Sequence, residues 1–174
     1  GIMIHLCLGS IYAYGVLRNP LQEHFESMGL APTAMEMTWP FITFLAFFSI
    51  TMPLAGPYIQ KYGPMNVSMV GGLLCGLGWI AASFASSPLM LIPLYGIIGG
   101  VGVGIAYGAP IAASALWFPD KRGLAVGLTV LGFGFSSAVI TYTSRFLLDI
   151  GWGIMSIFVL FGFVFLTVSI LISM

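Results

Sequence analysis

Residues that could carry out catalysis or hold a metal ion are few in this chain of 174 residues, and they are far apart in the sequence. The histidines and cysteines are His5, Cys7, His24 and Cys75, whose positions do not follow the spacing of a metal site. The sequence also has no phosphate-binding loop and no cofactor motif. It therefore predicts neither a metal nor a cofactor, and it argues against a nucleotide-driven pump.

Serine-based hydrolysis is the enzymatic alternative, and the sequence argues against it as well. An intramembrane protease needs a serine nucleophile and a histidine base. Ser136 and the adjacent Ser137 lack the flanking glycine expected around such a nucleophile, and His5 would have to be the base. No oxyanion donors can be identified. We therefore expect that the protein is not an enzyme.

Two tyrosines are better candidates for contacting a ligand. Polar and small residues recur at helical spacing in two stripes: His5, Gly9, Tyr12, Val16 and Asn19 in the first, and Gly96, Gly100, Val103, Tyr107, Pro110 and Ser114 in the second. Each tyrosine offers a ring and a hydroxyl that can donate or accept a hydrogen bond. The stripes suit recognition of a polar solute, although a core tyrosine with a satisfied hydroxyl is an equally good interpretation of either residue.

The composition places these stripes in a membrane. Hydrophobic residues make up 59% of the chain and charged residues 6%, whereas soluble domains carry about 25% charged residues. This excludes a cytosolic enzyme, a disordered chain and a nucleic-acid binder, which would need a basic surface. In a bilayer, polar side chains normally face the bundle interior or a water-filled cavity.

The few charged residues mark the loops between apolar runs long enough to cross a bilayer. The sequence predicts an all-α membrane protein with six transmembrane helices, at 1–21, 37–60, 65–85, 89–118, 123–146 and 151–174. The chain starts with glycine inside one apolar run and stops directly after another, so we expect a fragment. Five aromatic residues in the second run are predicted to face lipid or to serve packing: Trp39, Phe41, Phe44, Phe47 and Phe48.

The basic residues predict the orientation of the spans. Lys61, Lys121 and Arg122 fall on one side of a six-span bundle, and Arg18 and Arg145 fall on the other. Because cytoplasmic loops are enriched in Lys and Arg, we expect Lys61 and Lys121 to face the cytoplasm. Both ends of the chain would then be cytoplasmic, in a multi-pass protein of the plasma (inner) membrane.

Glycines concentrate in the fourth and fifth predicted spans, and two interpretations remain open. Small residues let membrane helices pack closely. Glycine and proline also loosen a helix locally, which would allow these helices to bend and slide as a gate.

The segment from Gly56 to Pro64 is predicted to be the loop between the second and third spans. It resembles the loop signature of the major facilitator superfamily, in which Gly56, Lys61 and Gly63 are the matching residues. The acid of that signature is Gln60 here, and its following arginine is Met65. Ala13-Tyr14-Gly15 also recurs as Ala106-Tyr107-Gly108, which fits the three-plus-three inverted repeat of a half of this superfamily.

A second predicted loop indicates which branch of the superfamily the sequence resembles. Trp117-Phe118-Pro119-Asp120-Lys121-Arg122-Gly123-Leu124-Ala125 continues into Gly132-Phe133-Gly134. Together with Gly9-Ser10-Ile11-Tyr12-Ala13-Tyr14-Gly15, this segment resembles the oxalate/formate antiporter family, with monocarboxylate transporters as near neighbours. The resemblance implies the N-terminal six-helix half of a twelve-helix carrier, whose C-terminal half would be a separate partner.

The resemblance also implies a substrate cavity between two halves, lined here by Tyr12, Tyr107 and Phe133. Ring edges are positive and tyrosine hydroxyls can donate to a carboxylate, so an aromatic box suits a small organic anion. The basic anchors for the anion would lie in the other half. We therefore predict a secondary transporter of a small carboxylate that works by alternating access. Exchange and proton symport both remain open.

Other residues have predicted roles outside this box. Arg18 is either an interfacial anchor or part of the funnel leading to the substrate, and His5 is either a structural histidine or a proton carrier. Asp120, Lys121 and Arg122 are either a solvated turn or an inner gate. The functional alternatives are a proton-coupled carrier of another small solute and a non-transporting membrane scaffold or sensor.

Overall fold

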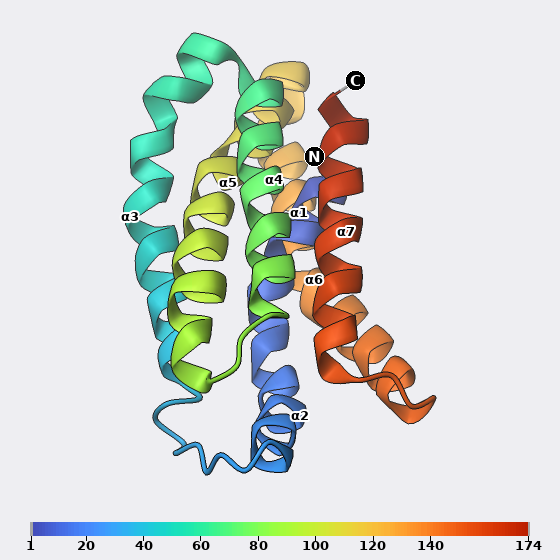
Figure 1. Cartoon of the computed structure of the whole chain (residues 1–174). Helices are drawn as coiled ribbons and strands as arrows, with labels where there is room; N and C mark the ends of the chain where they lie inside the picture. The colour runs from blue at the N-terminus through green and yellow to red at the C-terminus, as the bar shows by residue number, and fades with distance from the viewer. Residues whose placement is uncertain (1, 174) are drawn as a thin grey trace.

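The computed structural model describes residues 2–173, and the side chains of residues 2–171, as a bundle of helices that run up and down (Figure 1). Five long helices follow one another: α3 (Trp39–Tyr62), α4 (Pro64–Ala82), α5 (Ile98–Trp117), α6 (Arg122–Asp149) and α7 (Ile154–Ser173). The segment before them is divided into α1 (Ile2–Leu8), the 3₁₀ turn η1 (Gly9–Ala13) and α2 (Tyr14–Ser27). Over the described residues, the all-α prediction is confirmed.

Five membrane spans agree with the prediction. Among the described residues, five helical stretches are long and apolar enough to cross a bilayer: 39–62, 64–82, 88–117, 119–149 and 154–171. They match the predicted second to sixth spans to within a few residues. The first predicted span is helical but in three short pieces, so a count of six stays a prediction. Gly1 and Met174, the outer ends of the predicted spans, lie outside the described residues.

The segment from Gly56 to Pro64, which was predicted to join the second and third spans, is helical except at Gly63. Helix α3 continues to Tyr62, and Gly63 alone joins it to α4 with a φ of 82°. That backbone conformation favours glycine, so Gly63 has the predicted turn role. Gly56 and Lys61 lie on the helix instead. Pro57 removes a single backbone hydrogen bond from the helix. A loop at this position would leave several backbone groups without partners in an apolar environment, which costs more.

Glycines on α5 bring its backbone against two neighbours. On one side, a Cβ on Gly100 would lie 2.6 Å from the carbonyl oxygen of Phe44 in α3. On another, a Cβ on Gly102 would lie 2.5 Å from the backbone nitrogen of Cys75 in α4. Close packing of small residues therefore accounts for this stripe. Outside it, a Cβ on Gly127 of α6 would meet nothing within 4 Å.

The predicted fourth span has an irregular start. Its first turns are the 3₁₀ turn η2 (Pro88–Met90) and the π-helical turn η3 (Ile92–Ile97), after which α5 begins. Pro93 lies inside η3 and cannot donate a backbone hydrogen bond. A widened turn absorbs that loss and keeps the segment helical.

The segment 28–38 closes the end of the bundle between α2 and α3. The guanidinium of Arg18 donates to the carbonyl oxygen of Ala34 (2.9 Å), and the Tyr14 hydroxyl donates to that of Met37 (2.9 Å). The Thr33 amide and hydroxyl both donate to the Glu36 carboxylate, at 2.8 and 2.9 Å. Both hydrogen bonds lower the pKa of Glu36 below its ordinary value, and the bond from the Thr33 amide has the larger effect.

Candidate substrate site

An aromatic cluster joins the three predicted lining residues, and they come from three different elements. The Phe133 ring of α6 lies 5.0 Å from that of Tyr107 in α5 and 5.5 Å from that of Tyr12 in η1, measured between centroids. Both pairs meet edge to face, with interplanar angles of 80° and 83°. Residues separated by up to 121 positions in the sequence are therefore brought to one place.

Two glycines make this meeting possible. A Cβ on Gly9 would lie 2.7 Å from the Cβ of Ser136 and would also collide with the backbone at Phe133. A Cβ on Gly132 would lie 3.0 Å from the carbonyl oxygen of Ile2. The first helical segment can therefore lie directly on α6, and this contact sets Tyr12 beside Phe133.

The members of the cluster differ in exposure. Phe133 is 6% exposed and Tyr107 is half-buried, whereas Tyr12 is 51% exposed. The phenylalanine is therefore the buried member of the cluster, and the two tyrosines are more exposed. Positive ring edges and hydroxyl donors can hydrogen-bond a flat carboxylate but cannot neutralise its charge.

His5 belongs to the same cluster. Its ring lies 5.1 Å from that of Tyr107 and 5.9 Å from that of Phe133, and the residue is fully buried. Its position behind the tyrosines fits a structural histidine, and a proton-carrying role stays a prediction.

Phe48 of α3 is a member that the sequence reasoning missed. Its ring lies 5.3 Å from Tyr107 and 6.3 Å from Phe133. The sequence predicts only that Phe48 faces lipid or serves packing, like its aromatic neighbours on the same helix. Among these neighbours, Phe44 is completely buried against Tyr95. Helix α3 is apolar on every face, so no pattern in the sequence distinguishes these positions.

Arg18 lies outside the cluster but shares a cavity with one of its members. A small cavity of about 150 Å³ is lined by Tyr12, Arg18 and Met37, among others. The Arg18 side chain is partly exposed there and donates to Ala34. This position is compatible with both predicted roles of Arg18, anchor and funnel.

The charged turn between α5 and α6 lies at the end of the bundle where α3 passes into α4 (Figure 1). Asp120 and Lys121 belong to the 3₁₀ turn η4 (Pro119–Lys121), and Arg122 begins α6. All three side chains are exposed, like that of Lys61. The structure does not bring them to the aromatic cluster, and their gating role stays a prediction.

Comparison with known proteins decides the family. The profile described as Major Facilitator Superfamily matches residues 2–174. The chain belongs to the Major Facilitator Superfamily. It is similar to monocarboxylate transporter 14 of Mus musculus, with 30% identity over 84% of this chain and 28% of the relative. It is also similar to the oxalate:formate antiporter of Oxalobacter formigenes, with 31% identity over 76% of this chain and 30% of the relative.

A third relative is apicoplast pyruvate carrier 1 of Toxoplasma gondii, 27% identical over 77% of this chain and 31% of the relative. The matched part of the chain thus covers less than a third of the length of each of these relatives. The predicted resemblance to the superfamily, and to its carriers of oxalate, formate and monocarboxylates, is confirmed. These relatives are transporters, which agrees with the expectation of a non-enzymatic membrane protein.

Proposed function

We propose that this chain is the N-terminal six-helix half of a secondary transporter for a small carboxylate anion. The meeting of Tyr12, Tyr107 and Phe133 is the observation that carries the proposal. The cluster is assembled from three elements, is partly open, and offers hydroxyl donors beside positive ring edges. The names of the relatives, which include a pyruvate carrier and an oxalate:formate antiporter, support a carboxylate as the substrate.

The division of charge between two halves follows from the positions of the basic residues. Lys61, Lys121 and Arg122 lie at one end of the bundle. Arg18 shares a small cavity with Tyr12, but its guanidinium donates to the carbonyl oxygen of Ala34. An anion at the tyrosines would therefore need a cation from the C-terminal half. In this mechanism the tyrosines orient the carboxylate, and rocking of the two halves exposes it alternately to each side of the membrane.

Helix packing supports the three-plus-three repeat. Helix α3 packs on α5, and the segment α1–η1 packs on α6. A two-fold axis that exchanges the first three spans with the last three would exchange these two pairs. It would also map the contact between α4 and α7 onto itself. In such a repeat, Tyr107 would correspond to Tyr14, because both are the tyrosine of an Ala-Tyr-Gly segment.

Transport by the full-length protein in liposomes tests the function. We expect uptake of a radiolabelled small carboxylate, and Tyr107→Ala should lower its kcat/KM by roughly 10- to 100-fold, because a hydrogen bond to a charged group contributes about 1.5–3 kcal/mol. Tyr107→Phe separates the contribution of the hydroxyl from that of the ring. Tyr142→Ala is the matched control, since Tyr142 is 75% exposed on α6 and outside the cluster.

Two outcomes would contradict the proposal. Equal and mild effects of Tyr107→Ala and Tyr142→Ala would remove the cluster from the substrate pathway. Absence of carboxylate-dependent uptake or exchange by the folded wild-type protein would instead favour a scaffold or sensor, or a carrier of a different solute.

A further inference from the structure

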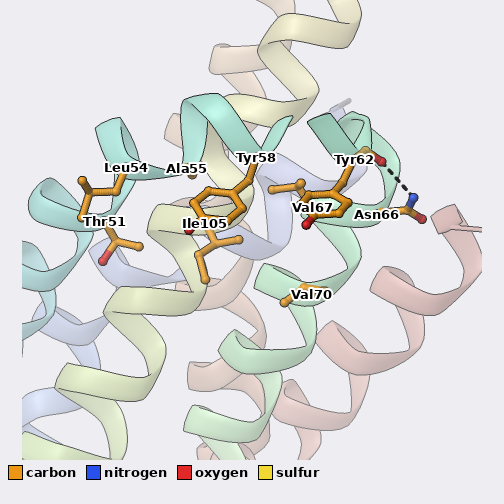
Figure 2. Close-up of a pocket in the computed structure, with 9 residues that line it drawn as sticks. All are labelled: Thr51, Leu54, Ala55, Tyr58, Tyr62, Asn66, Val67, Val70 and Ile105. Atoms are coloured by element: carbon orange, nitrogen blue, oxygen red, sulfur yellow. Dashed lines mark hydrogen bonds between the residues drawn. The ribbon is translucent and has the colours of Figure 1, made fainter. Parts of the chain in front are cut away.

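A second site candidate is an apolar groove formed by three helices on the outside of the bundle (Figure 2). Its volume is about 600 Å³, within the range of about 300–1,000 Å³ typical of ligand sites. Helix α3 contributes Leu54, Tyr58 and Tyr62, α4 contributes Val67 and Val70, and α5 contributes Ile105.

The groove exists because α3 and α5 separate toward the end of the bundle that holds Lys61. A Cβ on Gly104 would lie 3.0 Å from the carbonyl oxygen of Phe48, so the two backbones are in close contact at that level. One turn further along, a Cβ on Gly108 would meet only the tip of the Ile59 side chain, at 3.2 Å. Pro53 and Pro57 interrupt the backbone hydrogen bonds of α3 in this region, which permits the bend.

The groove does not belong to the aromatic cluster. Ile105 lines the groove and Tyr107 lies in the cluster, and the two residues are two positions apart on α5. Because successive helical residues are rotated by about 100°, these side chains project from opposite faces of α5. A second half that covers the cluster would therefore leave the groove exposed to lipid.

One cation, Lys61, lies beside the aromatic lining of the groove, next to the turn between α3 and α4. The Lys61 ammonium lies 5.0 Å from the centroid of the Tyr62 ring, and Tyr62 lines the groove. Tyr58 and Tyr62 stack on each other and are both more than half exposed. An apolar slot below tyrosines and a lysine matches a phospholipid, which has an apolar chain below an anionic phosphate.

We propose that this groove binds one acyl chain of an anionic phospholipid, with the headgroup phosphate paired to Lys61. The acyl chain fills the space between Leu54, Val70 and Ile105. The tyrosine rings lie at the level of the glycerol backbone, in the membrane–water interface where amphipathic aromatic side chains are enriched. The lipid holds α3 against α4 at the point where glycine packing between α3 and α5 ends.

Native mass spectrometry of the full-length protein tests the proposal, with phosphatidylglycerol and phosphatidylcholine of identical acyl chains as probes. We expect the wild type to retain phosphatidylglycerol preferentially. Val70→Trp should fill the groove and lower the retained phosphatidylglycerol by one molecule. Leu77→Trp is the matched control, because Leu77 lies on the same helix outside the groove and is 51% exposed, against 48% for Val70.

The headgroup contact has its own variant. Lys61→Gln should weaken retention of phosphatidylglycerol about fivefold, as expected for one basic residue near a membrane surface, and leave phosphatidylcholine unchanged. Equal retention by wild type, Val70→Trp and Leu77→Trp would overturn the proposal. Equal retention of the two lipids by the wild type would also overturn it.

Photocross-linking of the unmodified protein provides a test that no variant can confound. Phosphatidylglycerol with a photoactivatable acyl chain should label peptides from residues 54–70, or the peptide that contains Ile105, in the full-length protein. Labelling confined to other peptides would show that another part of the protein covers the groove, and would overturn the assignment.

Discussion

Phe44 and Phe48 show how much the position of a single ring matters in this protein. The two residues are one helical turn apart on α3, and both are aromatic. Phe44 is fully buried and packs on Gly99, Gly100 and Tyr95, whereas Phe48 is half-buried against Tyr107. The first residue is therefore part of the core, and the second belongs to the candidate substrate site.

Replacement of Phe44 by alanine should destabilise the protein. Removing a completely buried ring leaves a cavity between α3 and α5, which typically costs about 3 kcal/mol or more. The free energy of unfolding in mixed micelles measures the effect. Phe84→Ala is the control, because Phe84 is 73% exposed. Similar losses for the two variants would show that Phe44 is not a core residue in the full-length protein.

The Thr33–Glu36 contact makes the segment 28–38 sensitive to acid. Because the pKa of Glu36 is lower in the folded protein, the carboxylate contributes stability at pH values above its unfolded-state pKa. That contribution is lost as the pH falls through the lowered pKa. Thr33→Val removes the hydroxyl donor and leaves the backbone donor. The pKa of Glu36 should therefore rise but stay below its ordinary value.

Carbon NMR of the glutamate carboxyl carbons measures this titration. Thr38→Val is the matched control, because the Thr38 hydroxyl donates to the carbonyl oxygen of Ala34 and not to Glu36. An unchanged Glu36 titration in Thr33→Val, or an equal shift in Thr38→Val, would contradict the role of the Thr33 hydroxyl.

At the scale of elements, glycine has two different functions in this bundle. On α5 it allows direct backbone contact with α3 and α4, as at Gly102. On α6, Gly127 and Gly134 have open space around them. Packing therefore explains the glycines of α5 and Gly132 of α6, whereas Gly127 and Gly134 are the better candidates for helix flexibility.

The same substitution should have opposite effects at the two kinds of glycine. Gly102→Ala forces a methyl group against the backbone of α4 and should destabilise by about 1–3 kcal/mol. Gly127→Ala meets no neighbour and should be neutral or stabilise by up to about 1 kcal/mol, because alanine favours the helix. Thermal unfolding in detergent compares them. Equal destabilisation by both variants would indicate that α6 is packed against another part of the protein at Gly127.

For the molecule as a whole, the distribution of basic residues predicts the orientation in the membrane. Between Leu30 and Asp120 the chain crosses the bundle three times, along α3, α4 and α5. The two residues therefore lie at opposite ends of the bundle (Figure 1). Lys61, Lys121 and Arg122 lie at the same end of the bundle as Asp120. By the positive-inside rule, we expect that end in the cytoplasm.

Labelling of engineered cysteines in intact cells tests this orientation. In a background in which Cys7 and Cys75 are alanine, a membrane-impermeant maleimide should react with Leu30→Cys from outside. It should react with Asp120→Cys only after permeabilisation. Reversed labelling would overturn the orientation, and labelling of both positions from outside would overturn the membrane path of α3 to α5.

The sequence alone determined the membrane spans from the second to the sixth and the superfamily. Lipid offers no hydrogen bonds to the backbone, so each long apolar run has to be helical, and the charged residues at 61, 120–122, 145 and 149 mark where most of the runs end. The segment from Gly56 to Pro64 indicated the superfamily, and the segment around Lys121 and Arg122, together with Gly9 to Gly15, indicated its carboxylate-carrier branch. The sequence also singled out Tyr12, Tyr107 and Phe133, through polar stripes and the resemblance, and the structure brings their rings together. Their role in lining a substrate site stays a prediction.

Tertiary structure decided how each helix is rotated about its axis and where it bends. Nearly uniform hydrophobicity leaves no face of α3 marked as buried, so packing on the glycines of α5 distinguishes Phe44 from Phe48. The sequence predicts that the second span ends at residue 60, whereas the structure continues α3 to Tyr62, so that Gly63 alone forms the turn. The groove beside Lys61 likewise arises where two helices separate, and a separation is a property of the pair rather than of either sequence.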